Sequence, residues 1–131
     1  MPGKTIIRNL KDVTPRTGTP GPEGVANYRL LATGPDGALH LTVAMDEIVP
    51  GGVVSPHYHT GAPTFDHAFY VASGRVEVKL GDGTSTVVGR GTIIYCPSDV
   101  SHALKNVGKT KAQVLRIGAS ATGEQGKTVH V

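Results

Sequence analysis

The sequence predicts an all-β fold in which short antiparallel strands form a sandwich or barrel. Segments rich in Val, Ile and Thr recur at short intervals over residues 27–117, and turns containing Gly or Pro separate them. No segment shows the 3.6-residue periodicity of an amphipathic helix, so we expect less than about a tenth of the residues in helix. The chain has 131 residues, 18 of them Gly and none of them Trp. That length and composition suit one domain of short strands joined by tight turns.

The elements are expected in the following order. Residues 1–26 predict an N-terminal arm with one strand over residues 5–10, since Pro, Gly and Thr dominate the stretch that follows it. Residues 27–118 predict the barrel, and residues 119–131 a polar tail that is frayed or docked at the surface. Within the barrel, strands are expected over residues 27–33, 38–48, 54–60, 67–72, 75–80, 85–88, 92–96, 102–106 and 112–117.

Alternation along the strands predicts which side chains face inward. His67 shares a face with Phe69 and Val71, so this set is expected inside the barrel. The strand over residues 38–48 divides into an apolar set and a more polar set. We expect the apolar set to line the barrel: Leu39, Leu41, Val43 and Met45.

Four of the six histidines lie where such strands could bring them to one metal ion. His57 and His59 share one face of a strand because they are two residues apart. His67 and His102 lie on later strands. A neutral imidazole offers one nitrogen lone pair to a divalent transition metal. The remaining two histidines, His40 and His130, are isolated in the sequence and are expected at the surface.

The residues around these histidines resemble the two sequence motifs of the cupin superfamily. In the first, Gly51 precedes the His57–His59 pair by five intervening residues, and the motif ends at Gly74. In the second, five residues separate Gly91 from Pro97, and three separate His102 from Asn106. The resemblance covers about residues 51–106. It implies a jelly-roll barrel, also called a double-stranded β-helix, with His57, His59 and His102 as metal ligands.

The sequence departs from the family pattern at two positions. His67 stands where the family usually has glutamate, with six residues between it and Gly74, and Asp99 replaces the customary glycine of the second motif's turn. Asp tolerates such a turn better than most residues. The first departure favours a four-histidine site of His57, His59, His67 and His102. It leaves open a three-histidine site, with His67 beside the ligands or with Asp66 moving in.

The resemblance implies a metal-dependent enzyme, and the ligand set suggests its chemistry. Four neutral imidazoles leave a divalent ion its full charge, and an octahedral ion with four protein ligands keeps two positions for substrate or water. Such a centre favours a small, oxygen-rich, enolisable substrate bound inside the barrel. The metal is expected to be Fe, Mn, Zn, Ni or Cu.

The sequence leaves three classes of function open. We place dioxygenase-like chemistry ahead of a non-oxidative Lewis-acid cyclase, isomerase or lyase of the polyketide-cyclase kind. A non-catalytic module that binds a metal or a small ligand is the third. Within the motif only Asp66 or His67 could move a proton, and Asp66 is the candidate catalytic residue.

The composition limits the kinds of partner and cellular compartment that we expect for this chain. The net charge of +3 comes from dispersed Lys and Arg, which does not favour nucleic acid. No apolar run has the length of a membrane span, and the single cysteine, Cys96, is consistent with a reducing cytoplasm. The resemblance also implies a homodimer paired through an edge strand, to which the strand over residues 5–10 could cross.

Overall fold

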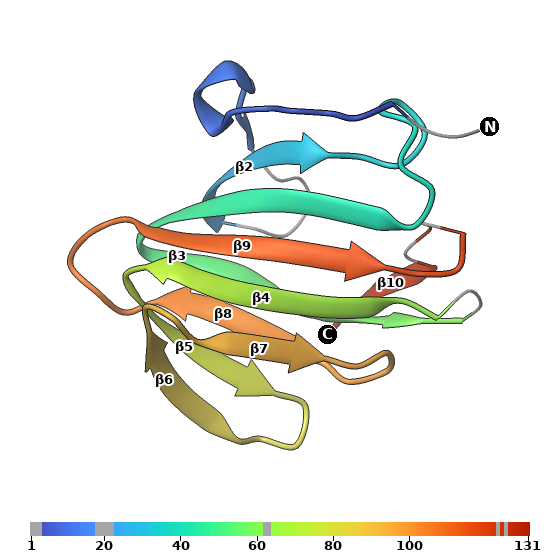
Figure 1. The fold of residues 1–131 in the computed structure, drawn as a ribbon. Coiled ribbons are helices and arrows are strands. Elements are labelled where there is room, and N and C mark those ends of the chain that lie inside the picture. Colours follow the sequence, from blue (N-terminus) through green and yellow to red (C-terminus); the bar gives the residue numbers. More distant parts are fainter. Residues whose placement is uncertain (1–3, 18–22, 62–63, 123, 125) are drawn as a thin grey trace.

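The fold is a single curled antiparallel sheet. A computed structural model describes residues 4–17, 23–61, 64–122, 124 and 126–131 (Figure 1). Apart from one 3₁₀ turn, η1 (Leu10–Asp12), every regular element in this part of the chain is a strand. The all-β prediction is therefore confirmed. The strands are β1 (Arg16–Thr17), β2 (Glu23–Leu31), β3 (Leu41–Thr60), β4 (Asp66–Ser73), β5 (Arg75–Leu80), β6 (Ser85–Gly89), β7 (Ile93–Cys96), β8 (His102–Asn106), β9 (Ala112–Ala119) and β10 (Lys127–His130).

The strand order, β6-β5-β8-β3-β9-β4-β7, makes β3 the link between two layers. Its first half pairs with β2 and β9, and its second half with β8 and β10. The two strands expected over residues 38–48 and 54–60 are thus one long strand. The chain turns from one layer to the other near Gly51, whose φ of 79° is a conformation that glycine adopts without strain.

The two ends of the chain differ from the sequence-based expectation. Residues 5–10 form no strand; instead Arg8 donates to both carboxylate oxygens of Asp36, at 3.0 and 3.1 Å. The tail is docked more closely than composition suggested, because β10 pairs with the last residues of β3. This pairing brings the C-terminal strand next to the histidine pair of β3.

The core lies between the two layers. Its largest fully buried apolar side chains are Phe69, Ile48, Leu104, Val71, Val76 and Val114. Each contributes roughly 1.5–3 kcal/mol by leaving water. His67, Phe69 and Val71 all face inward, as alternation on β4 predicted.

The inward face of β3 is the opposite of the one predicted. Ala44, Asp46 and Ile48 are buried, whereas Leu39 and Leu41 are exposed. A shift of one residue exchanges the two faces of a strand. The inner position can be polar here because Arg116 on β9 forms an ion pair with Asp46. The apolar set lies on the outside of the sheet.

Two residues of the second motif have structural roles that the sequence pattern suggested only in outline. Asp99 has a φ of 67°, so it occupies the left-handed turn conformation that the customary glycine would provide. The side-chain amide of Asn106 donates to the carbonyls of Ile48 and Thr110, at 2.8 and 2.9 Å. Asn106 therefore ties β8 to β3 and to the loop before β9.

Among the described residues, no helix has the length and apolar character that a membrane span requires.

Candidate metal centre

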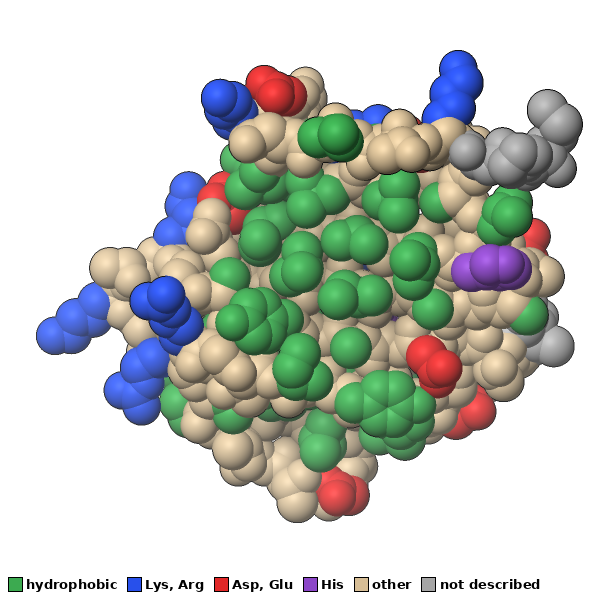
Figure 2. All heavy atoms as spheres, in the orientation of Figure 1, with side chains coloured by type: hydrophobic (Ala, Val, Ile, Leu, Met, Phe, Trp, Pro, Cys, Tyr) green, Lys and Arg blue, Asp and Glu red, His purple; other side chains and the backbone are tan. Residues whose placement is uncertain are grey.

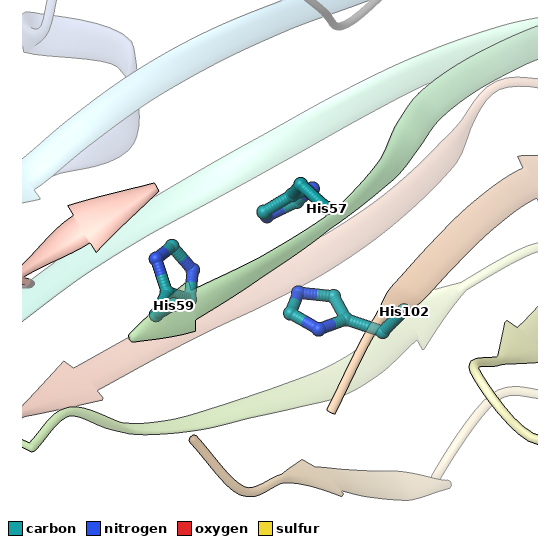
Figure 3. Close-up of side chains that lie close together, drawn as sticks. All are labelled: His57, His59 and His102. Carbon is teal, nitrogen blue, oxygen red and sulfur yellow. The ribbon is translucent and has the colours of Figure 1, made fainter. Parts of the chain in front are cut away.

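Three of the predicted ligands meet inside the sheet (Figure 3). His57 and His59 lie on the second half of β3, and His102 begins β8, in register with His57. One ring nitrogen of each histidine lies within 4.8 Å of those of the other two. Residues from two segments more than 40 positions apart thus form one group of potential ligands.

Each of the three rings is held through its Nδ1 atom. The Nδ1 of His57 lies 2.8 Å from the carbonyl oxygen of Ser55, and the Nδ1 of His102 lies 3.3 Å from that of Val100. A carbonyl can only accept, so these Nδ1 atoms carry the proton and leave a lone pair on Nε2. The Nδ1 of His59 lies 3.2 Å from the hydroxyl oxygen of Thr128 on β10.

Two of the nitrogens that remain free are fully buried. The Nε2 atoms of His59 and His102 have no hydrogen-bond partner in the described part of the chain. A buried polar atom without a partner costs roughly 1–3 kcal/mol, so its presence calls for an explanation. Oriented imidazoles with free Nε2 lone pairs are the donor set that a divalent transition metal prefers. The residues present therefore fit a metal ion.

His67 lies beside this group on β4. Its ring centroid is 5.3 Å from that of His59 and 5.4 Å from that of His102. Its Nδ1 is also buried and without a partner among the described residues. His67 is not one of the three histidines whose ligand atoms meet. That it binds the ion as a fourth ligand stays a prediction.

Burial keeps these imidazoles neutral. Removal from water lowers the pKa of His57, and lowers the pKa of His59 and of His102 to about 4. It lowers the pKa of His67 to about 2, and nearby histidines act in the same direction. Because a metal binds the unprotonated ring, the site is in its binding form at neutral pH.

A polar pair faces the same cavity. The Nε and Nη2 of Arg116 on β9 donate to the two carboxylate oxygens of Asp46 on β3, at 3.1 and 3.2 Å. Burial raises the pKa of Asp46, and the guanidinium of Arg116 opposes that rise. Asp46 is thus a buried carboxylate within the cavity, which sequence reasoning did not identify.

The cavity is small, with a volume of about 140 Å³. Typical sites for drug-sized ligands are ~300–1,000 Å³, so this one suits a small molecule or the reacting end of a larger one. Val54, Phe65 and Phe69 form its apolar wall. Its polar lining comprises Asn27, Thr42, Asp46, Ser55, His57, His59, His67, Arg116, Thr128 and His130.

Several of these cavity residues were not predicted from the sequence. Arg116 had a usable signal, because it is the one charged residue in the apolar run Val114-Leu115-Arg116-Ile117. Thr128 and His130 had none, since the strand that carries them pairs with residues about 70 positions earlier in the chain. His130 was expected at the surface; it is exposed, yet it also lines the cavity, with its ring centroid 5.8 Å from that of His57.

Asp66 lies outside the site. It is exposed on the outer face of β4, and its Oδ1 accepts a hydrogen bond of 3.0 Å from the hydroxyl of Tyr95. Neighbouring residues on a strand point to opposite faces, so Asp66 points outward where His67 points inward. The structure therefore gives no support to Asp66 as the catalytic residue. His40 is exposed and lies near the carbonyl of Ser120, away from the cavity.

Comparisons with known proteins agree with this fold. A family model described as the Cupin domain matches residues 44–118. Among solved structures, the polyketide cyclase RemF from Streptomyces resistomycificus is 25% identical, with a TM-score of 0.83, and the match covers 98% of this chain and 86% of that one.

Two further structures share the fold at lower identity. A predicted oxalate decarboxylase from Thermotoga maritima is 21% identical, with a TM-score of 0.76, covering 88% of this chain and 99% of that one. A sugar phosphate isomerase of the cupin superfamily from Silicibacter pomeroyi is 22% identical, with a TM-score of 0.70, covering 85% and 73%. No curated protein matches the sequence.

Proposed function

The chain belongs to the cupin domain family, and from this premise we propose that it is a metal-dependent enzyme with non-oxidative cyclase or isomerase chemistry. Its substrate would be small, oxygen-rich and enolisable at the end that enters the cavity. The observation that carries the proposal is the juxtaposition of free histidine nitrogens with the Arg116–Asp46 pair in one cavity.

The metal would be held by His57, His59 and His102, with His67 as the predicted fourth ligand. A divalent ion bound there would act as a Lewis acid toward a carbonyl or enolate oxygen. The candidates remain Fe, Mn, Zn, Ni and Cu, because imidazole ligands suit all of them to different degrees.

Arg116 would bind and orient the substrate. Its guanidinium has five N–H groups, of which the Nε and one Nη2 proton are donated to Asp46. The others are donated to no protein acceptor within the described residues, and the side chain lines the cavity. An oxygen anion of the substrate is the partner that such a group prefers.

Asp46 would move the proton. Two donors hold its carboxylate in place, and burial raises its pKa toward the range in which a carboxylate can both accept and return a proton. The apolar wall of Phe65 and Phe69 would exclude water from this transfer. The proton shuttle that the motif lacked would therefore come from Asp46, on the first half of the strand that also carries His57 and His59.

Two observations favour the non-oxidative class over the dioxygenase that we placed first from sequence. The structure with a TM-score of 0.83 that matches 98% of this chain is a polyketide cyclase. In addition, Asp46 beside Arg116 would supply the proton-transfer group that a cyclase or isomerase requires.

The test uses metal-free protein reloaded with zinc under nitrogen. A panel of small β-diketones and α-hydroxyketones in deuterated water serves as probe, and NMR follows exchange of the proton next to the carbonyl. We expect zinc-dependent exchange, and we expect Asp46→Asn to lower it by roughly 10²–10⁴-fold while zinc binding persists.

Two other outcomes would support the alternative functions. Turnover that needs both iron and oxygen, with matched oxygen uptake, would reject the non-oxidative class. Stoichiometric metal binding without exchange of any probe, in zinc, iron, manganese or nickel forms, would favour the binding module. Thr42→Val, which removes a polar group four residues from Asp46 on the cavity wall, controls for general changes in cavity polarity.

A further inference from the structure

A second hollow lies at the end of β2, between that strand and the segment that precedes β1. It has a volume of about 510 Å³, and its charged lining consists of Arg8, Arg16, Arg29 and Asp36. Asp36 already has a partner, because the guanidinium of Arg8 donates to both of its carboxylate oxygens. Arg16 and Arg29 form no ion pair with any acidic side chain that the structure describes. The hollow therefore holds two cationic groups whose charge the protein leaves unbalanced.

Strand pairing connects this hollow with the metal cavity. Arg16 on β1 pairs with Asn27 on β2, and Asn27 pairs with Asp46 on β3. The side chains of directly paired residues lie on the same face of a sheet. Asn27 and Asp46 both line the metal cavity, so Arg16 lies on the same inner face, one strand beyond the cavity wall.

A second row across the strands places Arg29 in line with Arg116. Arg29 is two residues from Asn27, so it shares the inner face of β2. It pairs with Ala44 on β3, which in turn pairs with Arg116 on β9. Ala44 is buried and has only a methyl group, so no long side chain separates the two arginines in this row. With a strand spacing of ~4.8 Å, the backbone of Arg29 lies about 10 Å from that of Arg116.

The inner position of Arg29 reverses the usual pattern of an antiparallel sheet, in which charged residues face water and apolar residues face the core. The outward neighbour of Arg29 is Tyr28, which pairs with Met45. Figure 2 views this outer side of the layer, where hydrophobic side chains gather over the middle and Lys and Arg side chains lie around the margin. Solubility would be served by an arginine on the outer side, so the inner position indicates a role toward the cavity.

We propose that the substrate carries an anionic group, a carboxylate or a phosphate ester, which Arg16 and Arg29 bind while the reacting end occupies the metal cavity. This rests on the proposed function of the cavity and adds the class of its substrate. The metal cavity, of about 140 Å³, has room for the reacting end, and the second hollow has room for the remainder. Guanidinium groups bind carboxylate and phosphate oxygens through paired, charge-assisted hydrogen bonds. The anion would lie about 10 Å from the group bound at Arg116, a distance of two strand spacings.

Calorimetric titration of the zinc-loaded protein with three probes tests the proposal. Each probe is the same β-diketone with an alkyl chain that spans about 10 Å, the separation given by two strand spacings. The chain ends in a carboxylate, in the methyl ester of that carboxylate or in a phosphate ester. We expect both anionic probes to bind about tenfold or more tightly than the methyl ester. The tighter of the two identifies the anion that the arginines prefer.

The double variant Arg16→Gln, Arg29→Gln should lose this preference, because glutamine keeps a polar side chain without the charge. Arg75→Gln, Arg90→Gln is the matched control, since it removes the same charge from two exposed arginines that line neither hollow, and it should keep the preference. Circular dichroism confirms that the variants are folded. If the double variant is not, each single variant, Arg16→Gln or Arg29→Gln, should reduce the preference by about threefold.

Three results would overturn the proposal. They are equal binding of the anionic probes and the ester by the wild type, binding of none of the probes, and an equal loss of preference in the control variant. The proposed reaction is tested separately, by proton exchange of the small neutral diketones. Absence of that exchange, with the preference for the anionic probes retained, would count against the reaction and would support the anion site.

Discussion

At the residue scale, the site depends on which nitrogen of each histidine is free. Backbone carbonyls next to β3 and β8 hold Nδ1 of His57 and His102, and the hydroxyl of Thr128 lies beside Nδ1 of His59. The ring orientation is therefore fixed by the protein before any ion arrives. Such prior arrangement raises metal affinity, because little entropy remains to be lost on binding.

The role of His67 is tested by removing its ring. If His67 is the fourth ligand, His67→Ala should weaken zinc binding by more than the roughly 10–100-fold typical of a residue that only supports a ligand. Competition with a chromophoric chelator measures the affinity. His40→Ala, which removes an exposed histidine outside the cavity, should leave it unchanged. A smaller loss in His67→Ala would assign the site to three histidines.

The stability of the metal-free protein should fall as the medium becomes acidic. Burial lowers the pKa of His59 and His102 from the ordinary 6.5 to about 4, so between these values the unfolded chain binds more protons than the folded one. The stabilising effect of neutral burial is thus complete above pH 6.5 and is lost as the pH falls toward 4. Between these two pH values, each histidine contributes up to about 1.4 kcal/mol of unfolding free energy per pH unit.

Urea unfolding of metal-free protein at pH 6.5, 6.0, 5.5 and 5.0 measures this slope before most carboxylates titrate. The double variant His59→Gln, His102→Gln should show a flatter dependence, because two of the buried rings are gone. A wild-type stability that does not change over this range would contradict the low pKa values.

At the element scale, two glycines in the turns between strands have different roles. Gly74, between β4 and β5, has a φ of 91°, and a Cβ on it would lie 2.7 Å from the Cβ of Ala112 on β9. Gly83, in the β5–β6 turn, has a similar φ of 87°, but a Cβ on it would meet no heavy atom within 4 Å among the described residues. The first glycine is required by conformation and by contact, and the second by conformation alone.

These two glycines form a matched pair for mutation. Gly83→Ala should cost about 1–2 kcal/mol of unfolding free energy, the usual cost of a left-handed conformation. Gly74→Ala should cost that amount and a further 1–3 kcal/mol, roughly the cost of overpacking against β9. Chemical denaturation measures both. Equal losses would show that β9 moves aside freely, and would contradict the close packing of the first motif against it.

At the scale of the whole molecule, the site lies between the two layers, and the outer sides of the layers differ in polarity. The cavity between them holds the histidines and the Arg116–Asp46 pair, while the outer sides differ, one charged and the other apolar. Because β3 passes through both layers, it carries ligands in one layer and the partner of Arg116 in the other. Metal binding should therefore stabilise the two layers together.

Removal of metal tests this coupling. Zinc at 100 times its dissociation constant should raise the unfolding free energy by about 2.7 kcal/mol, since it binds the folded chain. Thermal unfolding with zinc and with excess chelator measures the difference, which should shrink in His57→Ala. An unchanged melting temperature at saturating zinc would mean that the metal also binds the unfolded chain or that the site does not exist.

The sequence by itself determined the local features. The spacing of His57 and His59, the turn at Asp99 and the inward face of β4 follow from neighbours along the chain, and all three agree with the structure. The match to both motifs also identified His102 correctly as the third member of the group.

Only the tertiary structure decided features that depend on pairing between distant strands. The inner face of β3 near Asp46 was predicted from hydrophobicity alone, but the more polar side is the inner one, and there Asp46 forms an ion pair with Arg116 on β9, 70 residues away. Thr128 and His130 reach the cavity because β10 pairs with β3, and nothing local to them indicates that register. Alternation of apolar and polar residues shows that a strand has two different faces, but which face becomes the inner one is settled by the sheet as a whole.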